Sequence, residues 1–264
     1  MVATFYRFAN LAPIAGAAVP GAEALDRELR QLASARGVRG TIVLAGEGVN
    51  GSLCGSAGAV EIVLSRLRAL PGLAGLQARF SRTPEPAFDR LRVRWRSEIV
   101  TMGHPDLRPG LDAPAGIPVA PAAWDALIAD PHTLLIDTRN AFEVAMGTFP
   151  GALDPGLASF RAFPAWGKTG LAPHLEQRRP QRVALFCTGG IRCEKASAWL
   201  HRQGLPEVYQ LEGGILRYLA EIPPERSRWR GACFVFDRRG ALSHGLTPLF
   251  SGPEGGRGLA ETGR

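Results

Sequence analysis

The stretch Arg182-Val-Ala-Leu-Phe-Cys187-Thr-Gly-Gly-Ile-Arg192-Cys193 decides the fold that this 264-residue sequence predicts. Residues 183–186 form a short apolar run without Gly or Pro, which is typical of a buried strand. Paired glycines in 188–192 permit a tight loop, and from Cys193 the apolar residues recur at helical spacing as far as Gly204. The pattern therefore places Cys187 in a loop between a strand and a helix, where ligands bind in open α/β sheets.

Cys187 is the candidate nucleophile, because its predicted surroundings favour a thiolate over a thiol. Successive N–H groups of a glycine-rich loop form a concave anion site, and the following helix contributes partial positive charge. Arg192 adds a full positive charge, which would also hold an anion after the sulfur has reacted. The alternative is a buried structural cysteine at a strand end. The candidate active-site loop consists of Cys187, Thr188, Gly189, Gly190, Ile191, Arg192 and Cys193.

The spacing of this loop bears on the group that it could hold. Four residues separate Cys187 from Arg192, one fewer than in the loop with which a cysteine phosphatase wraps a phosphate. The shorter ring suits a smaller group, such as a persulfide sulfur on Cys187. Cys193 could resolve an oxidised Cys187 as a disulfide or could pack as a thiol at the helix start, and we favour the second. Lys195 could lower the pKa of the thiol or could simply face solvent.

Three flanking segments make this region resemble a rhodanese domain. Leu134-Leu-Ile-Asp137-Thr-Arg139 resembles the rhodanese strand that ends in Asp-x-Arg. Gly147-Thr-Phe-Pro-Gly-Ala152 is similar to its Gly-His-x-Pro-Gly-Ala box, with Thr148 in place of His, and Leu211-Glu-Gly-Gly214 is similar to its closing segment. We expect Asp137 and Arg139 to fix the neighbouring loop by ion pairing and hydrogen bonding, a structural role before a catalytic one.

The whole chain resembles a narrower family, the bacterial rhodanese-like tRNA uridine hydroxylases. The similarity rests on the cysteine loop and on three further signatures: Gly46-Glu-Gly-Val-Asn50-Gly51-Ser, Glu98-Ile-Val-Thr-Met-Gly103 and Cys233-Phe-Val-Phe-Asp237. The resemblance implies an oxidoreductase that hydroxylates the wobble uridine of tRNA, at position 34, to 5-hydroxyuridine. It also implies tRNA as the partner and molecular oxygen as the co-substrate. No other cofactor is evident in the sequence.

Two alternative functions remain open at this level. A sulfurtransferase that carries a persulfide on Cys187 is supported by the cysteine loop alone, and it would release sulfide or thiocyanate without RNA. A non-catalytic RNA-binding module with a vestigial loop predicts that Cys187→Ser changes no product. The chemistry of the loop by itself explains sulfur transfer, whereas hydroxylation comes from the resemblance.

Composition limits the class of protein without deciding the activity. The net charge is +7, and Lys168 and Lys195 are the two lysines, so the basic charge is almost entirely arginine. Arginine pairs with phosphate and stacks on bases, which suits an RNA partner, but a nucleotide-composition bias explains the same excess equally well. No apolar run approaches the length of a membrane span, and the N-terminus lacks the apolar core of a signal peptide, so we expect a cytoplasmic protein. The four cysteines lack zinc-finger spacing, and we expect no metal site.

The order of the expected elements divides the chain into two α/β domains. Residues 1–103 read as βαββαβ, the order of a ferredoxin-like sandwich, and a Pro- and Gly-rich linker is expected over 104–120. Strands that alternate with helices over 121–226 predict a doubly wound parallel sheet, and the resemblance described above implies that this domain is rhodanese-like. Within this domain, residues 154–180 are expected to be long and irregular. Residues 227–264 are expected to be a C-terminal extension that is partly disordered.

A possible RNA-binding face comes from the N-terminal domain. The segment Leu91-Arg-Val-Arg-Trp-Arg96 alternates with period two, so that its apolar side chains face the core while Arg92, Arg94 and Arg96 line the other face. A solvated sheet face is at least as good an explanation. Asn50 is expected in a loop, where polar side chains often bind ligands, although Asn50-Gly51 could equally supply ordinary turn chemistry.

Overall fold

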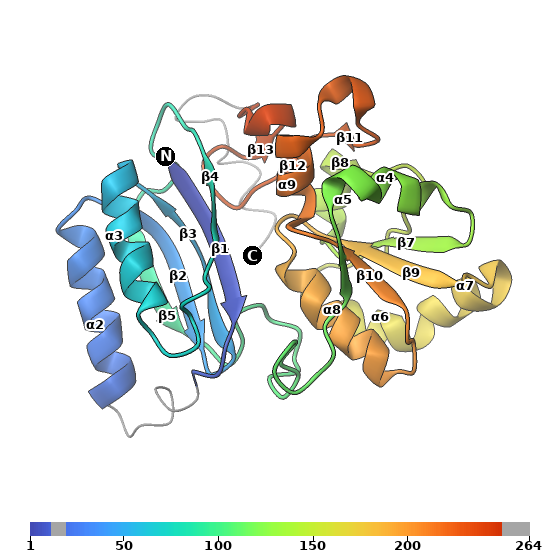
Figure 1. Cartoon of the computed structure of the whole chain (residues 1–264), viewed down its shortest axis with the longest axis horizontal. Coiled ribbons are helices and arrows are strands. Elements are labelled where there is room, and N and C mark those ends of the chain that lie inside the picture. The colour runs from blue at the N-terminus through green and yellow to red at the C-terminus, as the bar shows by residue number, and fades with distance from the viewer. Residues whose placement is uncertain (12–19, 250–264) are drawn as a thin grey trace. The chain divides into compact units, whose positions relative to one another are not determined.

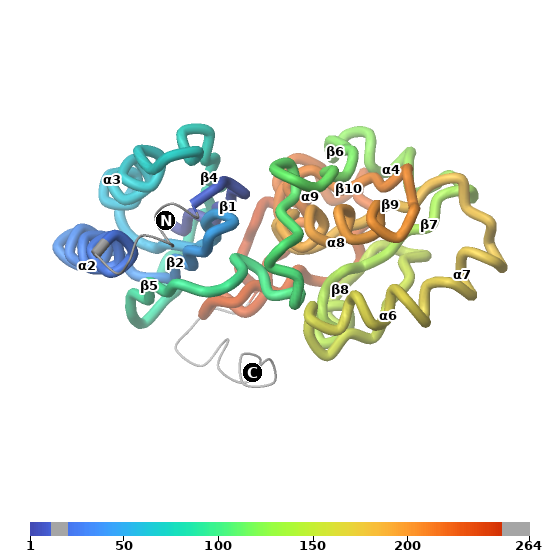
Figure 2. The backbone as a smooth tube through the Cα atoms, turned by 90° about the horizontal axis from the view of Figure 1, so that it is seen from below, coloured from blue at the N-terminus to red at the C-terminus, as the bar shows by residue number. Residues whose placement is uncertain are grey.

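The computed structural model describes residues 1–11 and 20–249 and separates into two units, Met1–Leu111 and Asp112–Arg264 (Figures 1 and 2). The disorder expected in the C-terminal extension falls on residues 250–264, outside the described residues. Within the described part of the chain, no helix is long and apolar enough to cross a membrane. Each unit has its own sheet and its own buried core.

The first unit has a five-stranded sheet with the order β4-β1-β3-β2-β5. The part β4-β1-β3-β2 confirms the ferredoxin-like topology, and β5 adds a strand parallel to β2. Helices α2 and α3 cover one face of this sheet (Figure 1). The elements are β1 (Val2–Phe8), α2 (Pro20–Ser34), β2 (Arg39–Ala45), β3 (Gly48–Cys54), α3 (Ala57–Arg68), β4 (Ala78–Ser81) and β5 (Leu91–Trp95).

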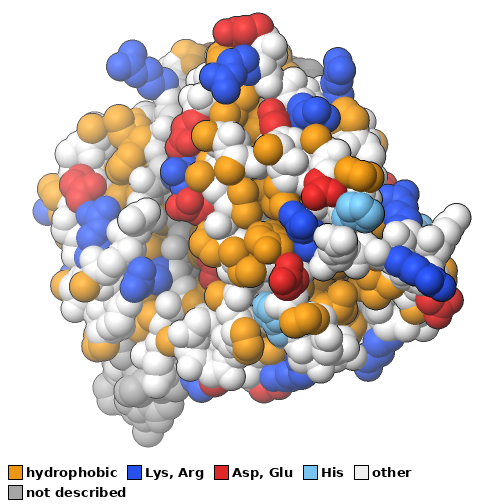
Figure 3. Space-filling model, turned by 45° about the vertical axis from the view of Figure 1, so that its right-hand side comes forward, with side chains coloured by type: hydrophobic (Ala, Val, Ile, Leu, Met, Phe, Trp, Pro, Cys, Tyr) orange, Lys and Arg blue, Asp and Glu red, His pale blue; other side chains and the backbone are white. Residues whose placement is uncertain are grey.

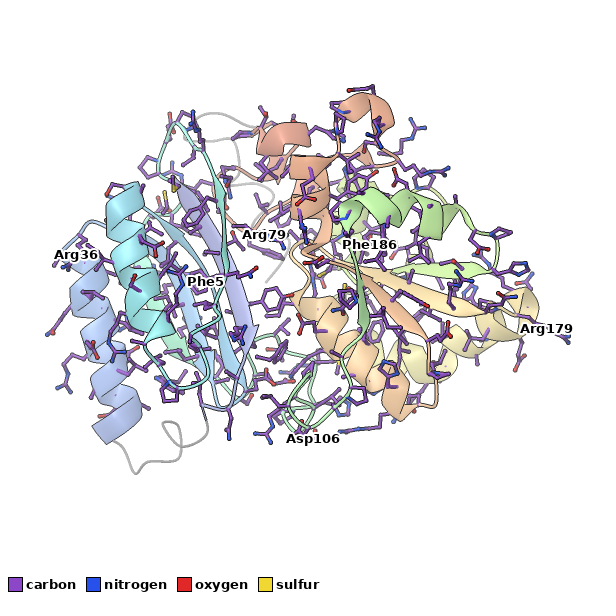
Figure 4. The ribbon with its side chains drawn as sticks, viewed as in Figure 1. Phe5, Arg36, Arg79, Asp106, Arg179 and Phe186 are labelled. Atoms are coloured by element: carbon purple, nitrogen blue, oxygen red, sulfur yellow. The ribbon has the colours of Figure 1, made fainter. Side chains whose placement is uncertain are left out.

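Asn50 lies within β3, so the expectation that it sits in a loop is wrong. The turn between β2 and β3 is only two residues long, because Ala45 pairs with Gly48. Gly51 indicated a turn in the sequence, but it lies inside β3, where the absence of a side chain lets neighbouring groups pack closely against the strand. A Cβ at Gly51 would lie 2.6 Å from the ring of Phe5, which projects into the buried core of this unit (Figure 4).

The second unit has the predicted parallel sheet, with the order β6-β10-β9-β7 and helices on both faces (Figures 1 and 2). Helices α4 (Pro121–Ala129), α5 (Ala141–Met146) and α9 (Gly214–Glu221) lie on one face, and α6 (Phe163–Thr169), α7 (Leu171–Arg178) and α8 (Ile191–Arg202) lie on the other. The strand β6 falls inside the expected linker 104–120, where its pairing with β10 overrides the Pro- and Gly-rich composition. The strands are β6 (Ile117–Val119), β7 (Thr133–Asp137), β9 (Arg182–Phe186) and β10 (Val208–Leu211).

The segment 154–180 is not irregular throughout, as the sequence suggested, because it contains two short helices. These are α6 (Phe163–Thr169) and α7 (Leu171–Arg178). A Cβ at Gly167 would lie 2.5 Å from the ring of Trp199 on α8. Glycine at this position therefore lets α6 pack closely against α8, and the packing outweighs its low helix propensity.

Residues 227–249 belong to the second unit, because their apolar side chains enter its core. Trp229, Cys233, Val235 and Leu242 are buried in the same cluster as Trp124 and Phe149. The strand β11 (Arg230–Gly231) pairs with β8 (Gly147–Thr148) and so connects the segment to the rest of the unit. Within the segment, β12 (Cys233–Phe234) pairs with β13 (Ala241–Leu242). On the face of the molecule shown in Figure 3, hydrophobic side chains gather in patches between scattered basic and acidic ones.

Candidate active site

Cys187 directly follows β9, as the sequence predicts, and Phe186 before it points into the aromatic core of the second unit (Figure 4). The helix α8 (Ile191–Arg202) begins two residues earlier than expected. Gly190 caps it with a φ of 102°, in the left-handed region that glycine adopts readily. Arg192 and Cys193 therefore lie in the first helical turn and not in the loop.

The sulfur of Cys187 is fully buried and accepts a hydrogen bond from the N–H of Gly190 at 3.1 Å. Burial alone would raise the pKa of this thiol, because it penalises the charged form. That effect is outweighed by a hydrogen bond from the side chain of Cys193, by the charge of Arg192 and by backbone N–H groups. Together they lower the pKa of Cys187 to about 5. The site therefore holds a thiolate at neutral pH.

The pKa of Cys193 is shifted in the opposite direction to that of Cys187. Burial raises the pKa of its thiol well above the ordinary value, and the hydrogen bond to Cys187 raises it further. Its sulfur also lies 3.8 Å from the hydroxyl of Thr138. A protonated Cys193 thus donates to the Cys187 thiolate, so the two sulfurs differ in protonation although both are fully buried.

Arg192 is held by a carboxylate that the sequence analysis missed. Its two terminal nitrogens donate to the oxygens of Glu143 at 2.6 Å and 2.8 Å, and one of them also donates to the hydroxyl of Thr188 at 3.1 Å. The hydroxyl of Thr188 in turn donates to Glu143 at 3.2 Å. Burial favours protonated Glu143, but the charge of Arg192 outweighs it and lowers the pKa of Glu143. Arg192 therefore acts on Cys187 through its charge, while its hydrogen bonds order the loop.

A signal for Glu143 was available in the sequence. It stands three residues after Asn140, the spacing of a helix N-terminal capping box. In the structure the backbone N–H of Asn140 donates to Glu143 at 3.1 Å, at the start of α5 (Ala141–Met146). One carboxylate thus both caps α5 and fixes Arg192, and only the tertiary structure reveals the second contact.

Asp137 and Arg139 form a fully buried ion pair behind the loop. The guanidinium of Arg139 donates to Asp137 at 2.9 Å and 2.6 Å and to the carbonyl of Glu143 at 3.2 Å. Thr148, at the position where the resembling box has His, donates its hydroxyl to Asp137 at 3.0 Å. This network joins the end of β7 to α5 and to β8. Lys195 on α8 is fully buried, so the alternative that it simply faces solvent is wrong.

The closing Gly-Gly segment supports the same loop from the other side. The N–H groups of Ile215 and Leu216, at the start of α9 (Gly214–Glu221), donate to the carbonyls of Cys187 and Thr188, each at 3.0 Å. A Cβ at Gly214 would lie 2.5 Å from the carbonyl oxygen of Cys187. Glycine is therefore required for α9 to approach the loop. Within residues 1–11 and 20–249, no group of three or more His, Cys, Asp or Glu side chains could hold a metal ion.

Two signatures of the first unit meet at Ile99. Its N–H donates to the carboxylate of Glu47 at 2.6 Å, and its carbonyl accepts from the side-chain amide of Asn50 at 2.9 Å. The carboxylate of Glu98 accepts further N–H groups from Met102, Gly103 and His104. These motifs thus hold the end of the first unit in one conformation, and Asn50 has a structural contact of its own.

The arginines of β5 lie on the face of the first sheet opposite α2 and α3. Leu91, Val93 and Trp95 pack on the core side, which leaves Arg92 and Arg94 on the other side. Arg94 and Arg96 are exposed, and Arg92 is half-buried. The register places one polar residue of each strand in a single row across the sheet, with arginine at both ends: Arg79, Thr4, Ser52, Thr41 and Arg92.

Comparison with known families agrees with this architecture. Residues 1–99 match the UPF0176 acylphosphatase-like domain, and residues 120–221 match the rhodanese-like domain. These matches agree with the observed fold class, an α+β sandwich followed by a parallel α/β sheet. The structure and the family models thus confirm the predicted succession of a ferredoxin-like and a rhodanese-like domain.

Curated relatives extend the match to nearly the whole chain. A tRNA uridine(34) hydroxylase of Mesorhizobium japonicum is 48% identical over 93% of this chain and 75% of its own length. The proteins of the same name from a Jannaschia species and from Gluconobacter oxydans are 47% and 49% identical, over 94% and 84% of this chain and 78% and 71% of their own lengths. This chain therefore belongs to the family of tRNA uridine(34) hydroxylases.

Proposed function

We propose that this chain hydroxylates the uridine at position 34 of tRNA to 5-hydroxyuridine, with molecular oxygen as the co-substrate. The main support is sequence identity. Over both domains, nearly half of the residues are identical to those of relatives named tRNA uridine(34) hydroxylase. The tRNA is the partner, and the enzyme works in the cytoplasm, where its substrate resides.

Cys187 is the proposed reactive residue. Its low pKa supplies a thiolate at neutral pH, which is the nucleophilic form of the side chain. The residues Thr188, Gly189, Gly190, Ile191, Arg192 and Cys193 position it. Glu143 joins them as a positioning residue, because it fixes the guanidinium whose charge stabilises the thiolate. Asp137 and Arg139 support the loop from behind, and Lys195 is buried in the helix that follows it.

The first test is nucleoside mass spectrometry of tRNA from cells that lack the gene and carry a plasmid copy. The wild-type copy should restore 5-hydroxyuridine, and Cys187→Ser should not. Cys54→Ser, a buried cysteine of the first unit, is the matched control and should restore it fully. If Cys187→Ser also restores the product, Cys187 is not the reactive group. If no copy restores it, the hydroxylase assignment fails.

A second candidate function is transfer of sulfur from a persulfide on Cys187. It is favoured by the short loop and by the N–H of Gly190 directed at the sulfur, which could hold a terminal sulfur anion. Thiosulfate would transfer its outer sulfur to the thiolate and release sulfite, and cyanide would then remove that sulfur as thiocyanate. Purified protein should form thiocyanate without RNA if this is the activity. Retention of 5-hydroxyuridine formation by a protein that forms no thiocyanate would exclude it.

The face of the first sheet opposite α2 and α3 is the proposed phosphate-binding surface. Its support is the row that runs from Arg79 to Arg92, together with exposed Arg94 and Arg96. Asn50 lies in the next row, opposite Tyr6 and Val43, and Val43 is paired with Arg94. Arginine in such a row would bind phosphates without reading the sequence of the RNA.

Salt dependence tests this surface. In the double variant Arg92→Ala/Arg94→Ala, the slope of log Kd against log salt concentration should fall by about 0.7 for each lost phosphate contact on a single strand. Arg36→Ala is the control, since this exposed arginine lies at the end of α2 and donates to the carbonyl of Leu32 (Figure 4). Equal slopes for the double variant and the wild type would refute the surface.

A further inference from the structure

Phe236 is an aromatic side chain displayed on the surface of the second unit. Its exposed fraction is 61%, the highest among the large hydrophobic side chains within residues 1–11 and 20–249. Single exposed apolar residues are common and need no explanation. Phe236 differs from that ordinary case because its ring stands on other aromatic rings and not on flexible aliphatic side chains.

The rings of Phe234 and Phe142 pack against the ring of Phe236. Phe234 is 2% exposed and meets Phe236 edge to face, with 4.9 Å between the ring centroids. Phe142 meets Phe234 at 5.1 Å and Phe236 at 6.3 Å, both at nearly perpendicular angles. Edge-to-face pairs at such distances are attractive. The exposed ring is therefore held in place by Phe234, which is buried at the core of the unit.

The aromatic group is connected directly to the candidate active site. Phe142 belongs to the first turn of α5, and the next residue is Glu143. The side chain of Glu143 turns inward to Arg192 and Thr188 of the active-site loop, whereas Phe142 contacts Phe234 and Phe236. The first turn of one short helix thus joins the exposed ring to the residues that position the reactive cysteine.

We propose that Phe236 is a stacking platform for an unpaired base of the RNA substrate. The inference rests on the proposed function, since it takes single-stranded RNA next to position 34 as the ligand. An enzyme that modifies a base must hold it out of its stack, and aromatic faces are the usual support for unstacked bases. The net charge of +7 favours a polyanion over an apolar partner. Arg239 does not add to this attraction, because it is buried and paired with Asp237.

Binding of an RNA stem-loop that carries 2-aminopurine in its loop tests the platform. Wild-type protein should quench the fluorescence by stacking. Phe236→Ala should lose the quenching and weaken binding by about 5- to 100-fold. Phe236→Trp should keep both, because any large aromatic face can stack. A fully double-stranded RNA should bind wild type and Phe236→Ala equally.

Phe80→Ala is the matched control, because Phe80 is an exposed phenylalanine (43%) in β4 of the first unit. It should leave quenching and affinity unchanged. Phe236→Ala should keep the thermal unfolding midpoint within a few degrees, since the buried rings remain. Unchanged binding by Phe236→Ala, or equal losses in both variants, would overturn the platform.

Two further outcomes separate this proposal from its alternatives. If light scattering shows that Phe236→Ala abolishes a dimer, the ring serves a second copy of the chain and the proposal is wrong. If wild type quenches the probe through Phe236 but forms no 5-hydroxyuridine, the platform stands and the proposed hydroxylation fails. In a working enzyme Phe236→Ala should raise KM far more than it lowers kcat, whereas a role in the chemical step would lower kcat.

Discussion

The carboxylate of Glu143 on α5 accepts two hydrogen bonds, of 2.6 Å and 2.8 Å, from the guanidinium of Arg192 on α8. Both side chains are buried. The pair connects two helices that lie on opposite faces of the parallel sheet (Figure 1). It brings a guanidinium close enough to Cys187 to help lower the pKa of that thiol. The ionisation of the cysteine therefore depends on a residue 44 positions before it in the sequence.

The titration of the thiols should separate Cys187 from Cys193 and Cys233. Because the pKa of Cys187 is lowered to about 5, its thiolate absorbance should appear as the pH rises through that value. Burial raises the pKa of Cys233 to about 12, so Cys233 should remain a thiol at neutral pH. Ultraviolet difference spectra of wild type and Cys187→Ser measure this. A wild-type protein without the acidic step would contradict the assigned thiolate.

The same shift predicts how stability changes with pH. The folded pKa of Cys187, about 5, lies below the ordinary thiol value of 9.0. Between these values the unfolded chain binds one more proton than the folded chain, so stability increases as the pH rises. The contribution is lost as the pH falls through 5. Urea unfolding of wild type and Cys187→Ser should show a difference that grows with pH, on the order of 1 kcal/mol per unit. A constant difference would refute the shift.

Glu143→Gln keeps the shape of the side chain and removes its charge. Arg192 would then be a buried cation without its hydrogen-bonded carboxylate partner, which should cost about 3 kcal/mol of unfolding free energy in urea. Glu221→Gln is the control, because the pair of Arg217 and Glu221 is partly exposed and its loss should cost less than about 1 kcal/mol. Equal costs for the two variants would mean that burial does not set the strength of the Glu143 pair.

Thr148→Val removes the hydroxyl that donates to the buried carboxylate of Asp137. A hydrogen bond to a charged group contributes about 1.5 to 3 kcal/mol, so thermal and urea unfolding should show a loss of that size. Thr169→Val provides the comparison, because the hydroxyl of Thr169 donates only to the carbonyl of Ala165 on an exposed helix. The hydroxyl of Thr148 has no structural role if both variants are equally stable.

Gly214→Ala should disturb the active-site loop from behind. The added methyl group would meet the carbonyl oxygens of Cys187 and Thr188 at 2.5 Å and 2.6 Å, in a backbone conformation with φ of 66°. We expect about 1 to 3 kcal/mol of destabilisation and a higher pKa for Cys187, because the loop that stabilises the thiolate must move. Gly58→Ala in α3, where the methyl group meets no atom within 4 Å, should not destabilise the protein. If the pKa of Cys187 in Gly214→Ala equals that in the wild type, the loop tolerates the added methyl group.

The sequence by itself determined the local features that depend on neighbouring residues. The apolar run before Cys187, the paired glycines and the helical spacing after them fixed the strand, the loop and the helix, because each signal acts within a few residues. The alternation of Leu91–Trp95 likewise placed its arginines on one face. The order of the expected elements indicated two α/β domains, and the family resemblance identified the second as rhodanese-like.

Only the tertiary structure decided features in which distant segments compete with local preference. Gly51 indicated turn chemistry beside Asn50, yet it makes room inside β3 for the ring of Phe5. Gly167 likewise makes room in α6 for the ring of Trp199. The strand β6 forms in a Pro- and Gly-rich segment because β10 offers it backbone partners. In the sequence Glu143 has only the spacing of a helix-capping residue, and its contact with Arg192 arises from folding. Packing and charge pairing join residues far apart in the chain, and no local pattern in the sequence records them.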